Sequence, residues 1–180
     1  EHIPQEYCEN IMTEFFRCLK PGGAVRINMP DYDRIRLAAD TKDTNYFGNL
    51  IVKGLSFEEA VVEQIATSLV GVSAPEDIQN DYKKMTPIDF ANHYSNRASR
   101  EIQIKNGGHH INWFNFKKLG NMLREAGFNN FYKSSPQDSR FAELRGEGGI
   151  LTTGDLLEVK RMLGMDTTYP DRSLYVEAKK

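Results

Sequence analysis

The stretch that decides the fold is LKPGGAVRINMPD, residues 19–31, in which a sharp turn separates a helix from a strand. Pro21 removes a backbone donor, and the two glycines after it permit the positive φ of a tight turn. From Ala24 to Met29 apolar and polar residues alternate, which is the period of a strand. The stretch therefore predicts a helix that ends before Pro21 and a strand that begins after the glycines, as in half of an α/β unit.

The residues before the turn favour an amphipathic helix over residues 5–19, with Pro4 suited to its first turn. The apolar positions at helical spacing are Cys8, Ile11, Met12, Phe15 and Leu19. The sequence has two cysteines, Cys8 and Cys18, and ten helical residues separate them by roughly 15 Å. That distance is too long for a disulfide, so we expect two free thiols.

Two helix-start signals follow the strand. Ser56 and Glu59 have the spacing of a capping box, and Thr86 precedes a proline that opens a second helix, running to about Arg97. No strand signal of comparable strength accompanies them. We therefore expect residues 40–105 to form a mainly helical insertion over one end of a sheet.

The last third of the sequence returns to alternating helix and strand signals. Asn115 precedes an apolar helical stripe that ends at Gly127, and residues 128–134 and 173–178 are typical of strands. A short helix ending at Leu163 is expected between these two strands. The predicted order is helix, strand, helical insertion, helix, strand, short helix and strand.

Composition bounds the functional classes. The 180 residues are 39% hydrophobic and 27% charged, which is typical of one globular domain, and the net charge is -2. We expect no nucleic-acid partner, because the chain lacks a basic footprint. We expect no membrane partner, because no run approaches the roughly 18 apolar residues of a span. A cytoplasmic protein that acts on a small molecule is the resulting expectation.

Four segments, in this order, resemble the second half of class I S-adenosylmethionine-dependent methyltransferases. The segments are EHIP (1–4), FFRCLKPGGAVRINMPD (15–31), LGNMLREAGF (119–128) and SLYVEAKK (173–180). In the group they are most similar to, the fifth strand follows an R-x-L-K-P-G-G turn and ends in Pro-Asp. The resemblance implies a doubly wound, Rossmann-like α/β sheet of seven strands with the last strand antiparallel. This chain would be the C-terminal portion of that sheet.

The resemblance also implies domain boundaries. Residues 1–180 would form one partial domain, with residues 1–39 and 106–180 as the methyltransferase-like core. Residues 40–105 would form a lid at the acceptor site. By family order Glu1 falls directly after the fourth strand, so we expect on the order of a hundred further residues to be missing. The exposed sheet edge would then pair with another chain or with a second copy in a homo-oligomer.

The activity implied by the resemblance is methyl transfer from S-adenosylmethionine to a small-molecule or saccharide-linked acceptor. In the family, a glycine-rich turn after the first strand and an acid after the second hold most of this cofactor. Such a turn lets the backbone approach the ligand, and the acid accepts ribose hydroxyls. Neither element occurs in this sequence. The chain would therefore carry the acceptor side of the site.

Three candidate residues lie near the first helix and the first strand. The resemblance places His2 beside the cofactor pocket, and the alternative is a terminal histidine without a role. Asp31 would lie at the carboxyl end of its strand, where open α/β sheets bind ligands, and the alternative is an acid that caps the next helix. Tyr32 would contribute to the acceptor wall, or would be an exposed turn aromatic.

The stretch NGGHHINW, residues 106–113, is the most unusual local cluster. By resemblance it adjoins the acceptor opening, so His110 would line the substrate pocket or act as a general base, with His109 and Trp113 beside it. The alternative is that the histidine and tryptophan pack the loop onto the sheet. We predict no metal site, because adjacent histidine side chains diverge and no H-x-x-x-H spacing accompanies them.

Two other readings stay open. The chain could be a non-catalytic interaction or regulatory module that pairs with a cofactor-binding partner. It could also be an independent α/β domain whose likeness to the family is accidental. Binding of S-adenosylmethionine would separate the enzyme from the module, and a closed core with no exposed parallel edge would favour the independent domain.

Overall fold

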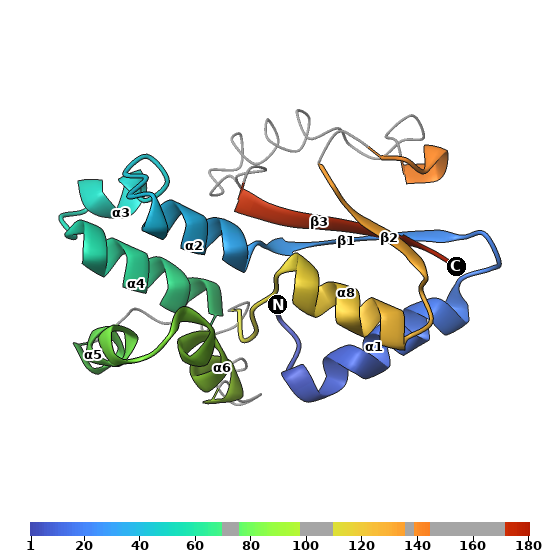
Figure 1. Cartoon of the computed structure of the whole chain (residues 1–180), viewed down its shortest axis with the longest axis horizontal. Coiled ribbons are helices and arrows are strands. Elements are labelled where there is room, and N and C mark those ends of the chain that lie inside the picture. The colour runs from blue at the N-terminus through green and yellow to red at the C-terminus, as the bar shows by residue number, and fades with distance from the viewer. Residues whose placement is uncertain (70–75, 98–109, 136–138, 145–171) are drawn as a thin grey trace, which may run out of the picture. The chain divides into compact units, whose positions relative to one another are not determined.

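The computed structural model describes residues 1–69, 76–97, 110–135, 139–144 and 172–180 (Figure 1). These residues form a mixed α/β protein with a three-stranded antiparallel sheet. The chain divides into two compact units. The helical unit comprises Glu1–Cys8 and Pro30–Asn115, and the sheet unit comprises Glu9–Met29 and Phe116–Lys180. The predicted helix ending at Leu163 lies outside the described residues.

The described elements follow the predicted order. They are α1 (Gln5–Cys18), β1 (Ala24–Pro30), α2 (Tyr32–Asp40), α3 (Gly48–Val52), α4 (Phe57–Leu69), α5 (Glu76–Lys84), α6 (Pro87–Arg97), α8 (Phe116–Glu125), β2 (Asn130–Ser134), a 3-10 turn (Ala142–Leu144) and β3 (Ser173–Lys179). The helix, turn and strand around Pro21 are confirmed, as are the later strands. Helices α3 and α5 were not predicted.

The sheet has the strand order β1-β3-β2, so the strand that comes last in the sequence lies in the centre. β3 runs antiparallel to β2, with Asn130 opposite Lys179 and Ser134 opposite Tyr175. The Pro-Gly-Gly turn is tied to the end of β3, because the Gly22 N–H donates to the Lys180 carbonyl at 3.0 Å. Gly22 has a φ of 79°, the left-handed conformation for which glycine is suited.

Helix α8 packs closely on β2 and β3 within the sheet unit (Figure 1). A Cβ added at Gly120 would lie 2.9 Å from the Phe131 ring, so glycine permits this approach. The Phe16 and Phe128 rings meet edge to face with centroids 5.0 Å apart. The apolar residues buried around this packing include Leu119, Met122, Leu123, Phe128, Leu174, Val176 and Ala178.

A buried carboxylate links the three strands. Glu177 of β3 is 0% exposed, and it accepts a hydrogen bond from Arg26 Nε of β1 at 2.7 Å and from Ser139 Oγ at 2.6 Å. The Tyr132 hydroxyl of β2 also donates to it. We call these four side chains the Glu177 network. Because it spans all three strands, it helps to fix their alignment.

The helical unit surrounds its own apolar core, with α4 beside α2, α5 and α6 (Figure 1). Both predicted helix starts are confirmed. The Ser56 N–H donates to Glu59 Oε2 at 2.8 Å, and the Glu59 N–H donates back to Ser56 Oγ at 3.3 Å. The Asp89 N–H donates to Thr86 Oγ1 at 3.2 Å. These reciprocal bonds satisfy backbone donors that a helix start would otherwise leave open.

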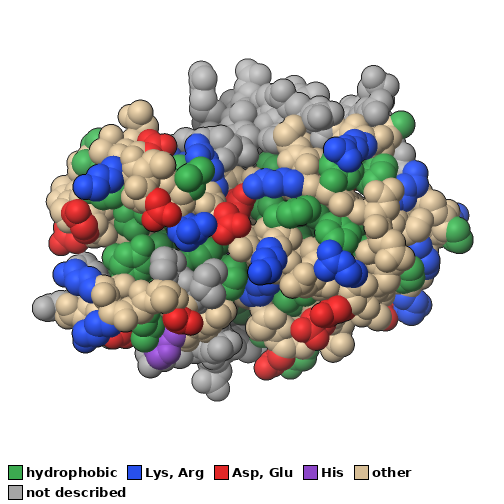
Figure 2. Space-filling model, viewed as in Figure 1, with side chains coloured by type: hydrophobic (Ala, Val, Ile, Leu, Met, Phe, Trp, Pro, Cys, Tyr) green, Lys and Arg blue, Asp and Glu red, His purple; other side chains and the backbone are tan. Residues whose placement is uncertain are grey.

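The surface carries both signs of charge. On the face shown in Figure 2, Lys and Arg side chains are interspersed with Asp and Glu. None of the described helices is both long and apolar enough to cross a membrane.

Candidate functional site

Asp31 occupies the junction between β1 and α2. Its carboxylate Oδ1 accepts the Asp33 N–H at 3.1 Å, so it caps α2, as one of the two sequence interpretations predicted. The same residue forms a parallel bridge with Phe114, and the Tyr32 N–H donates to the Phe114 carbonyl at 3.0 Å. The segment before α8 therefore runs beside the carboxyl end of β1. Asp31 is 3% exposed.

Tyr32 and Trp113 pack together in the core of the helical unit. Their ring centroids are 5.1 Å apart, and Trp113 Nε1 donates to Asn92 Oδ1 at 3.2 Å. Tyr32 is buried, so its reading as an exposed turn aromatic is wrong: it begins α2 and points into the core. Burial raises the pKa of the Tyr32 phenol, and nearby Tyr82 adds to the rise. The phenol is thus neutral at physiological pH and does not act as a base there.

Asn112 holds the first residues of the chain against the segment before α8. It is 1% exposed, and its Nδ2 donates to Gln5 Oε1 at 3.1 Å and to the Ile3 carbonyl at 3.4 Å. The Glu1 carbonyl accepts the Ile111 N–H at 2.8 Å and the Asn112 N–H at 3.1 Å. Sequence reasoning missed Asn112, because its partners lie more than a hundred residues away and leave no local pattern.

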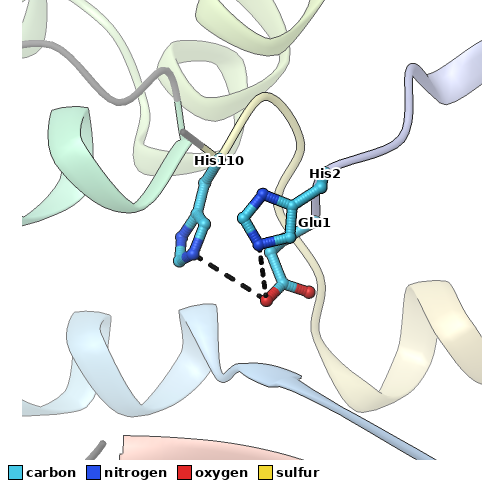
Figure 3. Close-up of side chains that lie close together, drawn as sticks. All are labelled: Glu1, His2 and His110. Carbon is cyan, nitrogen blue, oxygen red and sulfur yellow. Dashed lines mark ion pairs between the residues drawn. The ribbon is translucent and has the colours of Figure 1, made fainter. Parts of the chain in front are cut away.

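This anchoring brings Glu1, His2 and His110 together, and we call these three residues the Glu1 cluster (Figure 3). Glu1 Oε1 lies 3.5 Å from His2 Nε2 and 3.8 Å from His110 Nε2. The two imidazole rings meet edge to face with centroids 4.8 Å apart. Two predicted site residues, one on the cofactor side and one catalytic, are therefore neighbours. Sequence reasoning did not identify Glu1 as the third member.

The Glu1 cluster contains donors that metal ions use. One ligand atom from each residue lies within 4.8 Å of the others. Among the described residues, this is the group of three His, Cys, Asp or Glu side chains that lie close enough to hold one ion. The spacing argument against a metal compared histidines close in sequence, whereas Glu1 and His2 lie more than a hundred residues from His110. His109 lies outside the described residues.

The structure also places the two cysteines of the sequence. Cys8 is buried, Cys18 is exposed, and neither forms a disulfide, which confirms the expectation of two thiols. The Cys8 thiol donates to the Pro4 carbonyl at 3.4 Å and lies 3.4 Å from Asn112 Nδ2. Cys8 therefore belongs to the anchoring of the first residues.

The resemblance leads us to expect that the described residues lack the glycine-rich turn for S-adenosylmethionine. Their glycines with positive φ are Gly22, Gly54 and Gly127, and each follows a helix. A phosphate- or nucleoside-binding turn of the expected kind would instead lead from a strand into a helix. Within the described ranges, His2 is the one residue predicted to contact this cofactor.

No family model, curated protein or solved structure matches the chain.

Proposed function

We propose that the chain is the acceptor-side, C-terminal portion of an S-adenosylmethionine-dependent methyltransferase with a doubly wound, Rossmann-like sheet. The observation that carries this proposal is the position of β3, which comes last in the sequence and lies antiparallel between β1 and β2. An antiparallel last strand is what the sequence resemblance implies. The Pro-Gly-Gly turn before β1 and the Pro30-Asp31 pair at its end support the same assignment.

The acceptor side is assigned to the carboxyl end of β1. Open α/β sheets bind ligands at this end of their strands, and the bridge between Asp31 and Phe114 brings the segment of His110 alongside it. His110 is proposed to accept a proton from the acceptor's nucleophile, because histidine is the side chain that most often acts as a general base in enzymes. A small-molecule or saccharide-linked acceptor is proposed, with residues 40–105 as its lid.

The methyl donor is assigned to residues other than those described. The described glycines form no strand-to-helix turn. By the resemblance, the donor pocket would be formed by the family's first half or by a partner chain. His2 would touch the donor from the acceptor side. This division of the site gives the proposal a direct test.

Titration calorimetry with S-adenosylmethionine and with its demethylated product tests the division. The complete gene product is expected to bind both compounds, whereas residues 1–180 alone are expected to bind neither. Binding by residues 1–180 alone would show that the donor pocket is present, contrary to the proposal. A complete gene product that binds neither compound, even when its interaction partners are added, would overturn the methyltransferase assignment.

A further inference from the structure

The Glu1 cluster has the donor set of a metal site. It offers two imidazole nitrogens and one carboxylate oxygen, a combination that suits zinc and related divalent ions. With neutral imidazoles the three side chains carry one negative charge, which a divalent cation would more than neutralise. The set therefore favours a cation of the borderline type over a hard ion such as Mg²⁺, which prefers oxygen ligands.

The spacing of the donors is close to what a shared ion requires. Zinc binds nitrogen and oxygen at about 2.0–2.2 Å, so two ligands of a tetrahedral ion lie roughly 3.3 Å apart. The Glu1 oxygen is 3.5 and 3.8 Å from the two Nε2 atoms, which is longer than an ordinary hydrogen bond. Small side-chain rotations would bring all three donors to one ion. The His2 side chain is 46% exposed, so it has room for such a rotation.

The backbone beneath the cluster is held before any ion binds. The Glu1 carbonyl accepts two N–H groups from Ile111 and Asn112, directly beside His110. Asn112 is buried and fastens the following residues as well. A site with its backbone in place loses less conformational entropy on binding than a site on free segments. Solvent reaches the donors, since the Glu1 and His110 side chains are 19% and 29% exposed.

We infer that the Glu1 cluster binds one divalent transition-metal cation of the zinc class through Glu1 Oε1, His2 Nε2 and His110 Nε2. Three protein ligands leave a coordination position open for water or for an oxygen of another ligand. The inference goes beyond the methyltransferase proposal and does not depend on it. A metal on His110 Nε2 takes the lone pair that a general base would use, so one molecule cannot have both at that atom.

The test is calorimetric titration of ZnCl₂ into the tag-free complete gene product after treatment with a chelator, without S-adenosylmethionine. One ion per chain is expected to bind. His110→Ala and His2→Ala should each weaken the affinity at least about tenfold, since losing a ligand costs no less than losing its supporting partner. Glu1→Gln should weaken it while keeping the side-chain shape.

The matched control is His93→Ala, which removes a histidine on α6, outside the cluster. It should bind Zn²⁺ as tightly as the unaltered chain. The inference is overturned if the unaltered chain binds no Zn²⁺, or if His2→Ala and His110→Ala bind as tightly as His93→Ala. Because His2 is half exposed, its variant tests the site even if His110→Ala fails to fold.

Absorption of Co²⁺ in place of Zn²⁺ gives a second readout. A Co²⁺ ion with four or five ligands that include imidazole absorbs visible light more strongly than the hydrated ion. The band should appear in the unaltered chain and in His93→Ala, and should be lost in His2→Ala. A band of equal strength in all three proteins would place the ion elsewhere and contradict the inference. Neither measurement needs the methyl donor, so failure here leaves the methyltransferase proposal standing.

Discussion

The Glu177 network and the Glu1 cluster each place a carboxylate between side chains from distant segments. They differ in how exposed the carboxylate is and in how close its neighbours lie. Glu177 is fully buried, and its donors Arg26 and Ser139 lie 2.7 and 2.6 Å away. The Glu1 side chain is partly exposed, with its two imidazoles at 3.5 and 3.8 Å. The first carboxylate is satisfied by the protein at hydrogen-bond distance. The second lies beyond ordinary hydrogen-bond distance of the two imidazoles.

The difference also appears in the electrostatics. Burial by itself would raise the pKa of Glu177, but hydrogen bonds from Ser139, Tyr132 and Arg26 outweigh it and lower that pKa. The charged carboxylate is therefore part of the folded state, and its interactions contribute to the free energy of unfolding. We therefore expect the buried Glu177 network to contribute to the free energy of unfolding, and the partly exposed Glu1 cluster to contribute to ligand binding.

The largest expected effect is that of Glu177→Ala, which leaves Arg26 without its buried partner. Breaking a buried ion pair on one side costs about 3–5 kcal/mol, so the free energy of unfolding should fall by that amount in urea titrations. Glu14→Ala is the matched control, because Glu14 also pairs with an arginine, Arg17, but on the surface. Equal losses of unfolding free energy in the two variants would mean that the buried ion pair stabilises the fold no more than the surface pair does.

A smaller effect on the free energy of unfolding is expected at acidic pH. Because the folded pKa of Glu177 is lowered, its contribution is complete above the unfolded carboxyl pKa of about 4.3 and is lost as the pH falls through the folded value. The stability difference between the unaltered chain and Glu177→Gln should therefore shrink below about pH 4.3. Thermal unfolding of both proteins from pH 7 to pH 3 measures it. Curves that stay parallel would argue against a lowered pKa.

Asn112→Ala is expected to lower both the free energy of unfolding and the affinity for Zn²⁺. Loss of its hydrogen bonds is expected to lower the free energy of unfolding by about 1–2 kcal/mol. It should also weaken Zn²⁺ binding severalfold although no ligand is removed, since residues 1–5 lose their attachment. Urea titration and calorimetry on the same preparation give both values. Unchanged Zn²⁺ affinity would mean that Asn112 does not organise the cluster.

The smallest effect is expected for His2→Ala in the metal-free chain. The imidazole is half exposed and contacts Glu1 at 3.5 Å, so the free energy of unfolding should change by no more than about 0.5 kcal/mol. Added Zn²⁺ should then raise the unfolding temperature of the unaltered chain but not of the variant. A large loss of unfolding free energy without metal would mean that His2 stabilises the fold. The Glu1 cluster would then not differ from the Glu177 network in this respect.

Local chemistry explains which parts of the fold were predictable. The Pro21 turn, the Ser56 and Thr86 caps and the alternation in β1 depend on residues within a few positions of one another. Helix α3 spans five residues, Gly48–Val52, which is too short to display a helical period. The cap of α2 by Asp31 was one of two sequence interpretations of that acid, whereas neither interpretation of Tyr32 placed it in the core.

The candidate sites were predictable only in part, because their partners are distant in sequence. His2 and His110 were each identified, but nothing in the sequence indicated that they meet. Glu177 lies in SLYVEA, where it looked like an ordinary polar position of a strand. Its bond to Arg26 spans 151 residues. Pairs of this kind require the tertiary fold, which a single sequence does not provide.

The central position of β3 has a consequence for biosynthesis. The ribosome makes β1 and β2 before β3, yet among the described strands each of them pairs with β3. Both earlier strands must therefore wait with open hydrogen-bonding edges until β3 has emerged. Such late, long-range pairing slows folding and exposes strand edges to other chains. Nascent forms that stop before Ser173 should accordingly depend on chaperones more than the finished chain does.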